Sequence, residues 1–200
     1  MSKRLGRRFF ARPATELAPD LLNKVLVAPV GSARIVEVEA YAGTDDPGSH
    51  AYRGPTPRTE VMFGRPGHLY VYFTYGMHWC ANVVAEPRGT AGAVLLRAAT
   101  PLSGVDEMFE RRPKAKRLQD LCSGPAKLCQ ALGLDGDHDG LDLTVAALGV
   151  SIRDDDTAPP DVPARGVRVG LSHGQDLPWR WAVPDVADVS RPRPTLLAGP

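Results

Sequence analysis

Residues 69–85 read LYVYFTYGMHWCANVVA, and this stretch indicates the fold most clearly. Aromatic and β-branched residues dominate it, and these side chains favour strands. Gly76 stands near the middle, where a chain reversal needs a flexible backbone. The pattern predicts a β-hairpin with strands near 69–75 and 79–85 and with Tyr75 near its tip.

Other strands are predicted on both sides of this hairpin. Residues 34–41, RIVEVEAY, alternate so that one predicted face carries Ile35, Glu37, Glu39 and Tyr41. Residues 91–99, AGAVLLRAA, form a further apolar strand. Two late strands are expected in residues 141–152 (LDLTVAALGVSI) and 166–172 (GVRVGLS).

Helices are predicted in three places. Residues 14–27 indicate a short helix that runs into a strand. Residues 123–134 have Pro125 in the first turn and Gly133 at the end, which is typical of a complete short helix. Residues 103–121 are helical in pattern but are broken around Pro113.

The composition is that of an ordinary globular protein. The chain has 200 residues, 43% hydrophobic and 24% charged, which excludes general disorder and collagen. Three cysteines do not make a disulfide framework and fit a reducing cytoplasm. We expect one domain over residues 1–183 and a poorly ordered tail over 184–200, where RPRP occurs.

The net charge is only +1, but the charge is unevenly spread. Residues 1–12 and 111–117 each hold five basic residues, whereas residues 135–161 hold eight aspartates. This distribution allows a local surface that faces phosphates. Charge alone equally allows solvated loops, and both interpretations stay open here.

The residues with catalytic potential gather around a long loop, residues 42–68. Eight of the thirteen aromatic residues lie between Tyr41 and Trp79. Glu39 is predicted to share a strand face with Tyr41, and a carboxylate in such surroundings can act as a general base. Arg97 interrupts an apolar strand, so it either reaches solvent or pairs with a buried anion such as Glu39.

Several ordered segments together resemble one family. They are RIVEVEAY, TPRTEVMFGRPGHLYVYFTYGMHWCANVV, AVLLRA and CSGPAKLCQAL, and they resemble the 3-methyladenine (alkyladenine) DNA glycosylases from about residue 9 to 181. The resemblance implies an α+β fold: a single mixed α/β domain with a curved antiparallel sheet, surface helices and a protruding β-hairpin. It also implies an enzyme of base excision repair that flips alkylated or deaminated purines out of duplex DNA. Such an enzyme hydrolyses the N-glycosidic bond and leaves an abasic site.

The resemblance also assigns roles to residues of this chain. It implies that Glu39 is the general base and that Arg97 lies beside the attacking water. The base pocket would comprise Tyr41, His50, Tyr72 and Asn82, with Asn82 excluding guanine. Tyr75 would fill the gap left in the base stack. Arg53 and Arg58 are predicted to contact the DNA backbone.

The same resemblance implies double-stranded DNA containing damaged purines as the partner, with no membrane, cofactor or metal. We expect a monomer in the cytoplasm, associated with a bacterial nucleoid. Two other interpretations stay open: a non-catalytic nucleic-acid-binding module, and a hydrolase of free nucleosides. The first would explain the tyrosines and arginines, but not a carboxylate paired with an arginine on inner faces.

Overall fold

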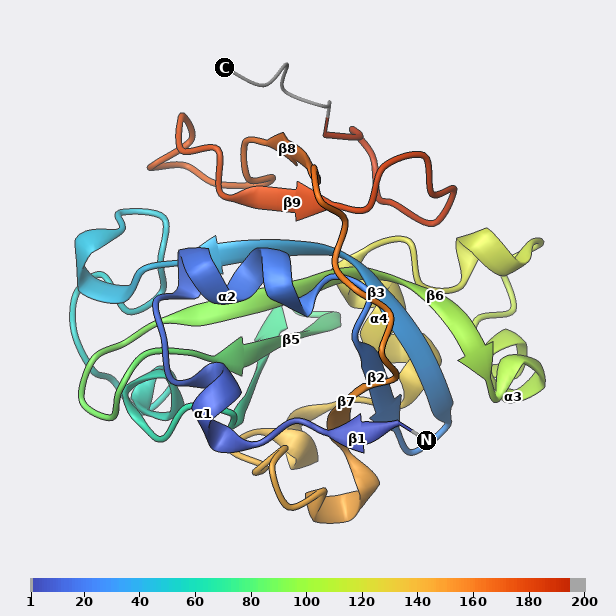
Figure 1. The fold of residues 1–200 in the computed structure, drawn as a ribbon, viewed down its shortest axis with the longest axis horizontal. Helices are drawn as coiled ribbons and strands as arrows, with labels where there is room; N and C mark the ends of the chain where they lie inside the picture. The colour runs from blue at the N-terminus through green and yellow to red at the C-terminus, as the bar shows by residue number, and fades with distance from the viewer. Residues whose placement is uncertain (1, 195–200) are drawn as a thin grey trace.

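The computed structural model of the chain describes residues 2–194, and one antiparallel sheet forms its centre (Figure 1). The helices are α1 (Arg7–Phe10), α2 (Ala14–Leu21), α3 (Val105–Arg111) and α4 (Pro125–Leu132). The strands are β1 (Lys3–Arg4), β2 (Val25–Ala28), β3 (Gly31–Tyr41), β4 (Leu69–Thr74), β5 (His78–Val84), β6 (Ala93–Ser103), β7 (Ser151–Asp154), β8 (Ala164–Gly166) and β9 (Arg180–Ala182).

The sheet runs in the order β1-β7-β2-β3-β6-β5-β4, and β9 pairs with both β3 and β8. The two longest strands, β3 and β6, lie side by side at its centre, and the sheet curls around the core (Figure 1). Every pairing between neighbouring strands is antiparallel in the described chain. The predicted α+β domain with a curved antiparallel sheet is therefore confirmed.

The hairpin forms where the sequence predicts it. Strands β4 and β5 pair from Leu69 to Thr74, and the turn between them has positive φ at Tyr75 (51°) and Gly76 (66°). Glycine adopts this left-handed conformation without a steric penalty, which explains Gly76. The turn holds the Tyr75 side chain out in solvent, with 81% of it exposed.

The helices also follow the predictions. Helix α2 buries its apolar face against the main core, and the chain then enters β2 as expected. Helix α4 has Pro125 in its first turn and ends at Gly133, which is left-handed with φ of 71°. Helix α3 ends at Arg111, before Pro113, and a 3₁₀ turn follows at Leu118–Asp120.

One predicted face of β3 is wrong, because the strand is irregular at its middle. Ile35 pairs with Ala99, whereas Glu37, two residues further along β3, pairs with the adjacent residue Ala98. Strand β3 therefore has an extra residue at Val36. A compensating irregularity on β6 follows, and it leaves Arg97 without a direct partner in the register. Each bulge reverses the alternation of side chains. Ile35 therefore points into the main core rather than sharing a face with Glu37.

The two late strands do not form where they were predicted, since β7 overlaps the predicted range 141–152 by two residues and β8 overlaps the predicted range 166–172 only at Gly166. Only Ser151–Asp154 and Ala164–Gly166 form strands in these regions. Residues 141–147 turn instead, because the Asp142 carboxylate accepts bonds from the backbone N–H and the hydroxyl of Thr144. Such local side-chain bonds compete with sheet formation.

The C-terminal segment contributes to the packing. We expected a poorly ordered tail over residues 184–200, of which 195–200 lie outside the described residues. In the structure Asp188, Val189 and Ser190 are buried. Ser190 lies against β3, where its backbone N–H donates to the Glu37 carboxylate over 2.6 Å.

Glu37 is the centre of a buried ionic network. Its carboxylate is fully buried and accepts bonds from Arg97 Nε (2.8 Å), Arg180 Nε (2.7 Å) and the Ser190 hydroxyl (2.8 Å). Burial would raise the pKa of Glu37, but the positive charges of Arg97 and Arg180 outweigh it, so the pKa is lowered. The network joins β3, β6, β9 and the C-terminal segment at one point.

We predict that Glu37→Ala strongly destabilises the chain. It leaves Arg97 and Arg180 buried with too few acceptors, and breaking a buried pair in this way costs about 3–5 kcal/mol. Urea unfolding measures the change. Glu107→Ala, which removes an exposed i,i+4 pair with Arg111, is the control and should cost about 0.5 kcal/mol or less. Equal losses in the two variants would contradict a structural role for the Glu37 network.

Candidate active site

A cavity of about 190 Å³ lies between the β4–β5 hairpin, β3, β6 and residues 169–171. Its wall gathers side chains from distant parts of the sequence. Six of the predicted site residues line it: Tyr41, His50, Tyr72, Tyr75, Asn82 and Arg97. The curled sheet brings the β4–β5 hairpin together with β3, β6 and residues 169–171, which lie far apart in the sequence. This grouping makes the cavity the candidate active site.

The seventh predicted residue, Glu39, lies fully buried behind this wall. Its Oε1 accepts a bond from the backbone N–H of Val169 (2.8 Å) and forms an ion pair with Arg97 Nη1 (3.1 Å). Its Oε2 accepts the Tyr41 hydroxyl over 2.9 Å. Each carboxylate oxygen can accept about two bonds. One acceptor position therefore remains on Oε2, the oxygen that Tyr41 also contacts.

Arg97 lies between two carboxylates. The sequence left open whether it reaches solvent or pairs with a buried anion, and the structure shows the buried pair. Its Nε donates to Glu37 and its Nη1 contacts Glu39, while only 5% of the residue is exposed. The irregular register of β6 at this point gives Arg97 access to both acids. Arg97 also lines the cavity, so it connects the buried network to the cavity wall.

Tyr41 is held in place by a second buried arginine. The guanidinium of Arg168 lies 4.7 Å from the centre of the Tyr41 ring. Arg168 is itself fixed by a buried ion pair with Asp46, with Nη2 to Oδ1 at 2.8 Å. Burial, the charge of Glu39 and the bond to it raise the pKa of Tyr41 well above its ordinary value. The Tyr41 hydroxyl therefore stays protonated and continues to donate to Glu39.

His50, Tyr70 and Tyr72 form an aromatic cluster on the opposite side of the wall. The rings of Tyr70 and Tyr72 stack with centroids 5.5 Å apart, and the His50 ring meets the Tyr72 ring edge-on at 4.6 Å. His50 Nδ1 lies 3.2 Å from the Tyr70 hydroxyl. Packing against these rings, with the positive charge of Arg58 nearby, lowers the pKa of His50 to about 4. The imidazole is neutral at pH 7.

Asn82 lies on β5, next to this cluster, and is 4% exposed. Its side-chain amide donates to the backbone carbonyl of Tyr70 over 3.1 Å. The bond fixes the orientation of the amide at the cavity wall. The neighbouring strand therefore holds Asn82 in a defined position.

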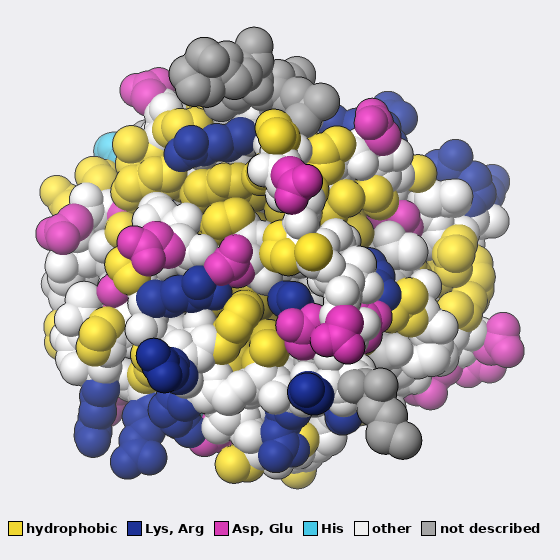
Figure 2. Space-filling view, viewed as in Figure 1, with side chains coloured by type: hydrophobic (Ala, Val, Ile, Leu, Met, Phe, Trp, Pro, Cys, Tyr) yellow, Lys and Arg dark blue, Asp and Glu magenta, His cyan; other side chains and the backbone are white. Residues whose placement is uncertain are grey.

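The two predicted backbone contacts, Arg53 and Arg58, are both exposed on the long loop. Arg58 lies over the aromatic cluster, with its guanidinium 5.2 Å from the centre of the Tyr72 ring. On the face drawn in Figure 2, Lys and Arg side chains concentrate toward the lower left, with few acids among them. The uneven charge of the sequence is thus also uneven in space.

Two parts of the site were not predicted from the sequence. Tyr70 lies on the same strand face as Tyr72 and Thr74, so the period of two along β4 could have identified it. Residues 169–171 also line the cavity, and Val169 donates to Glu39. No sequence signal marks that segment, because it reaches the site only through the folding of the chain.

Among residues 2–194, no cluster of three or more His, Cys, Asp or Glu side chains could hold a metal ion. Within the same part of the chain, every helix is too short or too polar to cross a membrane.

We predict that His50 titrates near pH 4, well below its ordinary value of 6.5. The folded chain holds this proton less tightly than the unfolded chain, so acidification from pH 7 toward 4 lowers stability through His50. NMR titration of the imidazole resonances measures the pKa. Arg58→Ala should raise it only part of the way, because packing against the rings remains. A midpoint near 6.5 in the unmodified protein would contradict the packed, neutral imidazole.

Comparison with known proteins identifies the family of the chain. Residues 8–187 match the family model described as "Methylpurine-DNA glycosylase (MPG)". A Burkholderia lata protein is 58% identical over 189 residues, which cover 94% of this chain and 91% of that protein. A Streptomyces avermitilis protein is 47% identical over 192 residues, covering 93% of this chain and 90% of that protein. Both are named "Putative 3-methyladenine DNA glycosylase". The chain therefore belongs to the methylpurine-DNA glycosylase family, as its motifs predicted, and it is a DNA glycosylase.

Proposed function

We propose that the protein excises alkylated or deaminated purines, such as 3-methyladenine, from duplex DNA in base excision repair. One observation carries this proposal: a buried carboxylate, Glu39, lies directly behind an aromatic cavity at the foot of a hairpin with an exposed tyrosine. The substrate is double-stranded DNA with a damaged purine. The protein works as a monomer in the cytoplasm, at the nucleoid, without a metal or cofactor.

The chemical step is hydrolysis by water. A water bound at the free acceptor position of Glu39 Oε2 attacks the anomeric carbon of the sugar. The new carbon–oxygen bond forms as the carbon–nitrogen bond to the base breaks, and the bonding electrons leave with the purine. Glu39 takes the proton from water, and Arg97 holds the carboxylate in place through its 3.1 Å contact.

The exposed hairpin explains how a base would reach the cavity. The glycosidic carbon is inaccessible inside the duplex, so the nucleotide must turn out of the stack. Tyr75 is 81% exposed and also lines the cavity. An aromatic side chain at this place fills the gap that the extruded base leaves. A hydrolase of free nucleosides would have no use for such a side chain.

The aromatic wall favours purines that carry positive charge. Tyr41 and Tyr72 enclose the base together with His50, and a cation over a tyrosine ring gains about 0.5–2 kcal/mol. The Tyr72 ring already attracts a cation, since Arg58 lies over it. Methylated purines are charged and are good leaving groups, whereas undamaged bases are neither.

Asn82 provides the selection against guanine. Its amide is fixed by the Tyr70 carbonyl, so it cannot turn aside for the exocyclic amino group of guanine. Arg53 and Arg58 contact the DNA backbone from the long loop. The role of Asn82 rests on its place in the cavity wall, that of Arg58 on its position over the Tyr72 ring, and that of Arg53 on its exposure on the same loop.

We predict that Glu39→Gln keeps its affinity for lesion-containing DNA but loses excision. The amide cannot take a proton from water, and the loss of a general base costs about 10²–10⁴-fold in rate. Single-turnover excision of 3-methyladenine from a defined duplex measures this. Glu60→Gln, at the exposed start of the 3₁₀ turn Glu60–Phe63, is the control and should cleave normally. Near-normal excision by Glu39→Gln would remove Glu39 from the role of base.

We predict that Tyr75→Ser impairs flipping more than chemistry. Serine cannot occupy the vacated space, so excision should fall most from stable base pairs and least from mismatches, where unstacking costs less. Met77→Ser is a matched control, because Met77 is a second exposed apolar residue of the same turn (67% exposed). The comparison is of single-turnover rates on paired and mismatched lesions. Equal losses on both substrates would show that Tyr75 serves in packing only.

A further inference from the structure

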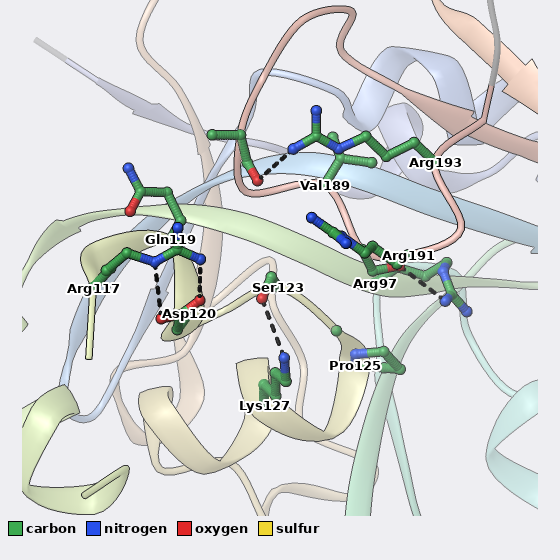
Figure 3. Close-up of a pocket in the computed structure, with 13 residues that line it drawn as sticks. Arg97, Arg117, Gln119, Asp120, Ser123, Pro125, Lys127, Val189, Arg191 and Arg193 are labelled. Atoms are coloured by element: carbon green, nitrogen blue, oxygen red, sulfur yellow. Dashed lines mark hydrogen bonds and ion pairs between the residues drawn. The ribbon is translucent and has the colours of Figure 1, made fainter. Parts of the chain in front are cut away.

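A second cavity, of about 560 Å³, lies on the other side of Arg97 from the base cavity. Figure 3 shows its walls: residues 117–120, the start of α4, and the C-terminal segment 187–193. Arg97 and Pro125 line both cavities. The second cavity is therefore directly next to the place where we propose that the flipped base binds.

The lining of this cavity is strongly basic. Five of its residues are cationic: Arg97, Arg117, Lys127, Arg191 and Arg193. The acid that lines it, Asp120, is paired with Arg117, with Nη2 to Oδ1 at 2.9 Å. Arg97 is paired with Glu37 and Glu39.

The remaining three cations, Lys127, Arg191 and Arg193, form no ion pair with any acid of residues 2–194. Lys127 contacts only the Ser123 hydroxyl (3.4 Å), and Arg193 donates to the carbonyl of Ala187 (3.2 Å), as Figure 3 shows. The nearby acid Asp188 is buried and bonded to Thr100. The cavity thus carries uncompensated positive charge on two facing walls.

The first turn of α4 adds backbone N–H donors, whose partial charge is also positive. Helix α4 has no acid in its first turn, and Gly124 supplies no side-chain cap. Free backbone N–H groups at a helix start favour anions. Cationic side chains and helix donors together suit a phosphate group, which arginine can bind through two parallel bonds.

We propose that this cavity binds the phosphodiester backbone of the lesion-bearing strand, immediately beside the flipped nucleotide. The proposal rests on the proposed function. A nucleotide with its base in the first cavity has phosphates on both sides of its sugar. Because Pro125 and Arg97 border both cavities, the strand leaves the base cavity across them and enters the basic one.

The Glu37 carboxylate holds both Arg97 and a wall of this cavity in place. Ser190, which lines the basic cavity, bonds to Glu37 through its backbone N–H (2.6 Å) and its hydroxyl (2.8 Å). Arg97 Nη2 also donates to the Ser190 hydroxyl (3.1 Å). The network therefore sets the distance between the bound backbone and Glu39. The C-terminal segment becomes part of the DNA interface through this anchor.

The test is a mutant cycle between protein and DNA. Each duplex carries one lesion. In each duplex a different one of the phosphates that flank the lesion is replaced by an uncharged methylphosphonate. Binding is measured by fluorescence anisotropy for the unmodified protein, for Arg191→Ala/Arg193→Ala, and for Lys127→Ala. The control Arg4→Ala removes an exposed arginine on β1, at the sheet edge opposite the hairpin.

We expect one flanking methylphosphonate to weaken binding to the unmodified protein about 10- to 100-fold, as for the loss of a charged hydrogen bond. In Arg191→Ala/Arg193→Ala the same methylphosphonate should change affinity less than about 2-fold, because the partner is already gone. Lys127→Ala should couple to the same phosphate or to its neighbour. Arg4→Ala should behave as the unmodified protein does.

Additive effects at every flanking phosphate would overturn the proposal, even if excision is normal. Inorganic phosphate is also added as a competitor. If it binds to the cavity without weakening the binding of DNA, the cavity is a site for free phosphate, and this result would also overturn the proposal. Excision by the unmodified protein is measured on the same duplexes. If the protein binds these duplexes but does not excise the lesion, only the proposed reaction is wrong. The mutant cycle would still decide whether the cavity binds the DNA backbone.

Discussion

The structure depends on one buried carboxylate that satisfies several partners at once. Glu37 accepts bonds from Arg97, Arg180 and both the backbone and the hydroxyl of Ser190, with no exposure to water. A buried charge is tolerated only when it is paired and hydrogen-bonded. Glu37 is on β3, and its partners Arg97, Arg180 and Ser190 are on β6, β9 and the C-terminal segment. None of these elements can therefore shift without leaving a charge uncompensated. Rigidity at this point is what places Arg97 against Glu39, and Glu39 against the cavity wall.

The paired bulges of β3 and β6 make this arrangement possible. In a regular antiparallel pair, Arg97 would have a fixed partner and would point to one face only. The extra residue at Val36 and the unpaired Arg97 change the local twist, and one guanidinium then contacts two acids. Bulges are frequent beside active sites because they redirect a side chain without breaking the sheet. The bulges shift side chains between the two faces, and Ile35 remains in the main core.

Local chemistry explains which parts of the molecule could be predicted from the sequence. The β4–β5 hairpin, α2 and α4 have strand or helix periodicity, with Gly76 in the hairpin turn and with Pro125 and Gly133 at the two ends of α4, and all three were predicted correctly. The bulge at Val36 and the burial of Ser190 depend on partners far away in the chain, so no local pattern marks them. The turn at Asp142 has a local cause, the bonds from Thr144 to its carboxylate, and there the apolar residues of 141–152 wrongly predicted a strand. For the site, the tyrosines and Glu39 were evident from their clustering, and the family resemblance supplied their roles. The contribution of Val169 and the basic cavity required the three-dimensional structure, because their residues come together only on folding.

The proton balance of the cavity bears on which purines leave easily. A neutral purine needs a proton on its departing nitrogen, and the titratable groups of the described wall are poor donors near neutral pH. Packing lowers the pKa of His50 to about 4, so its imidazole has no extra proton to give. Burial raises the pKa of Tyr41, Tyr70 and Tyr72 above their ordinary values, so these hydroxyls hold their protons more tightly. On the proposed function, a methylated purine brings the positive charge that assists its own departure, whereas a neutral deaminated purine has to be protonated by another group. Methylated purines carry that charge, and the same charge favours their binding to the tyrosine rings. One feature of the lesion thus serves both recognition and reaction.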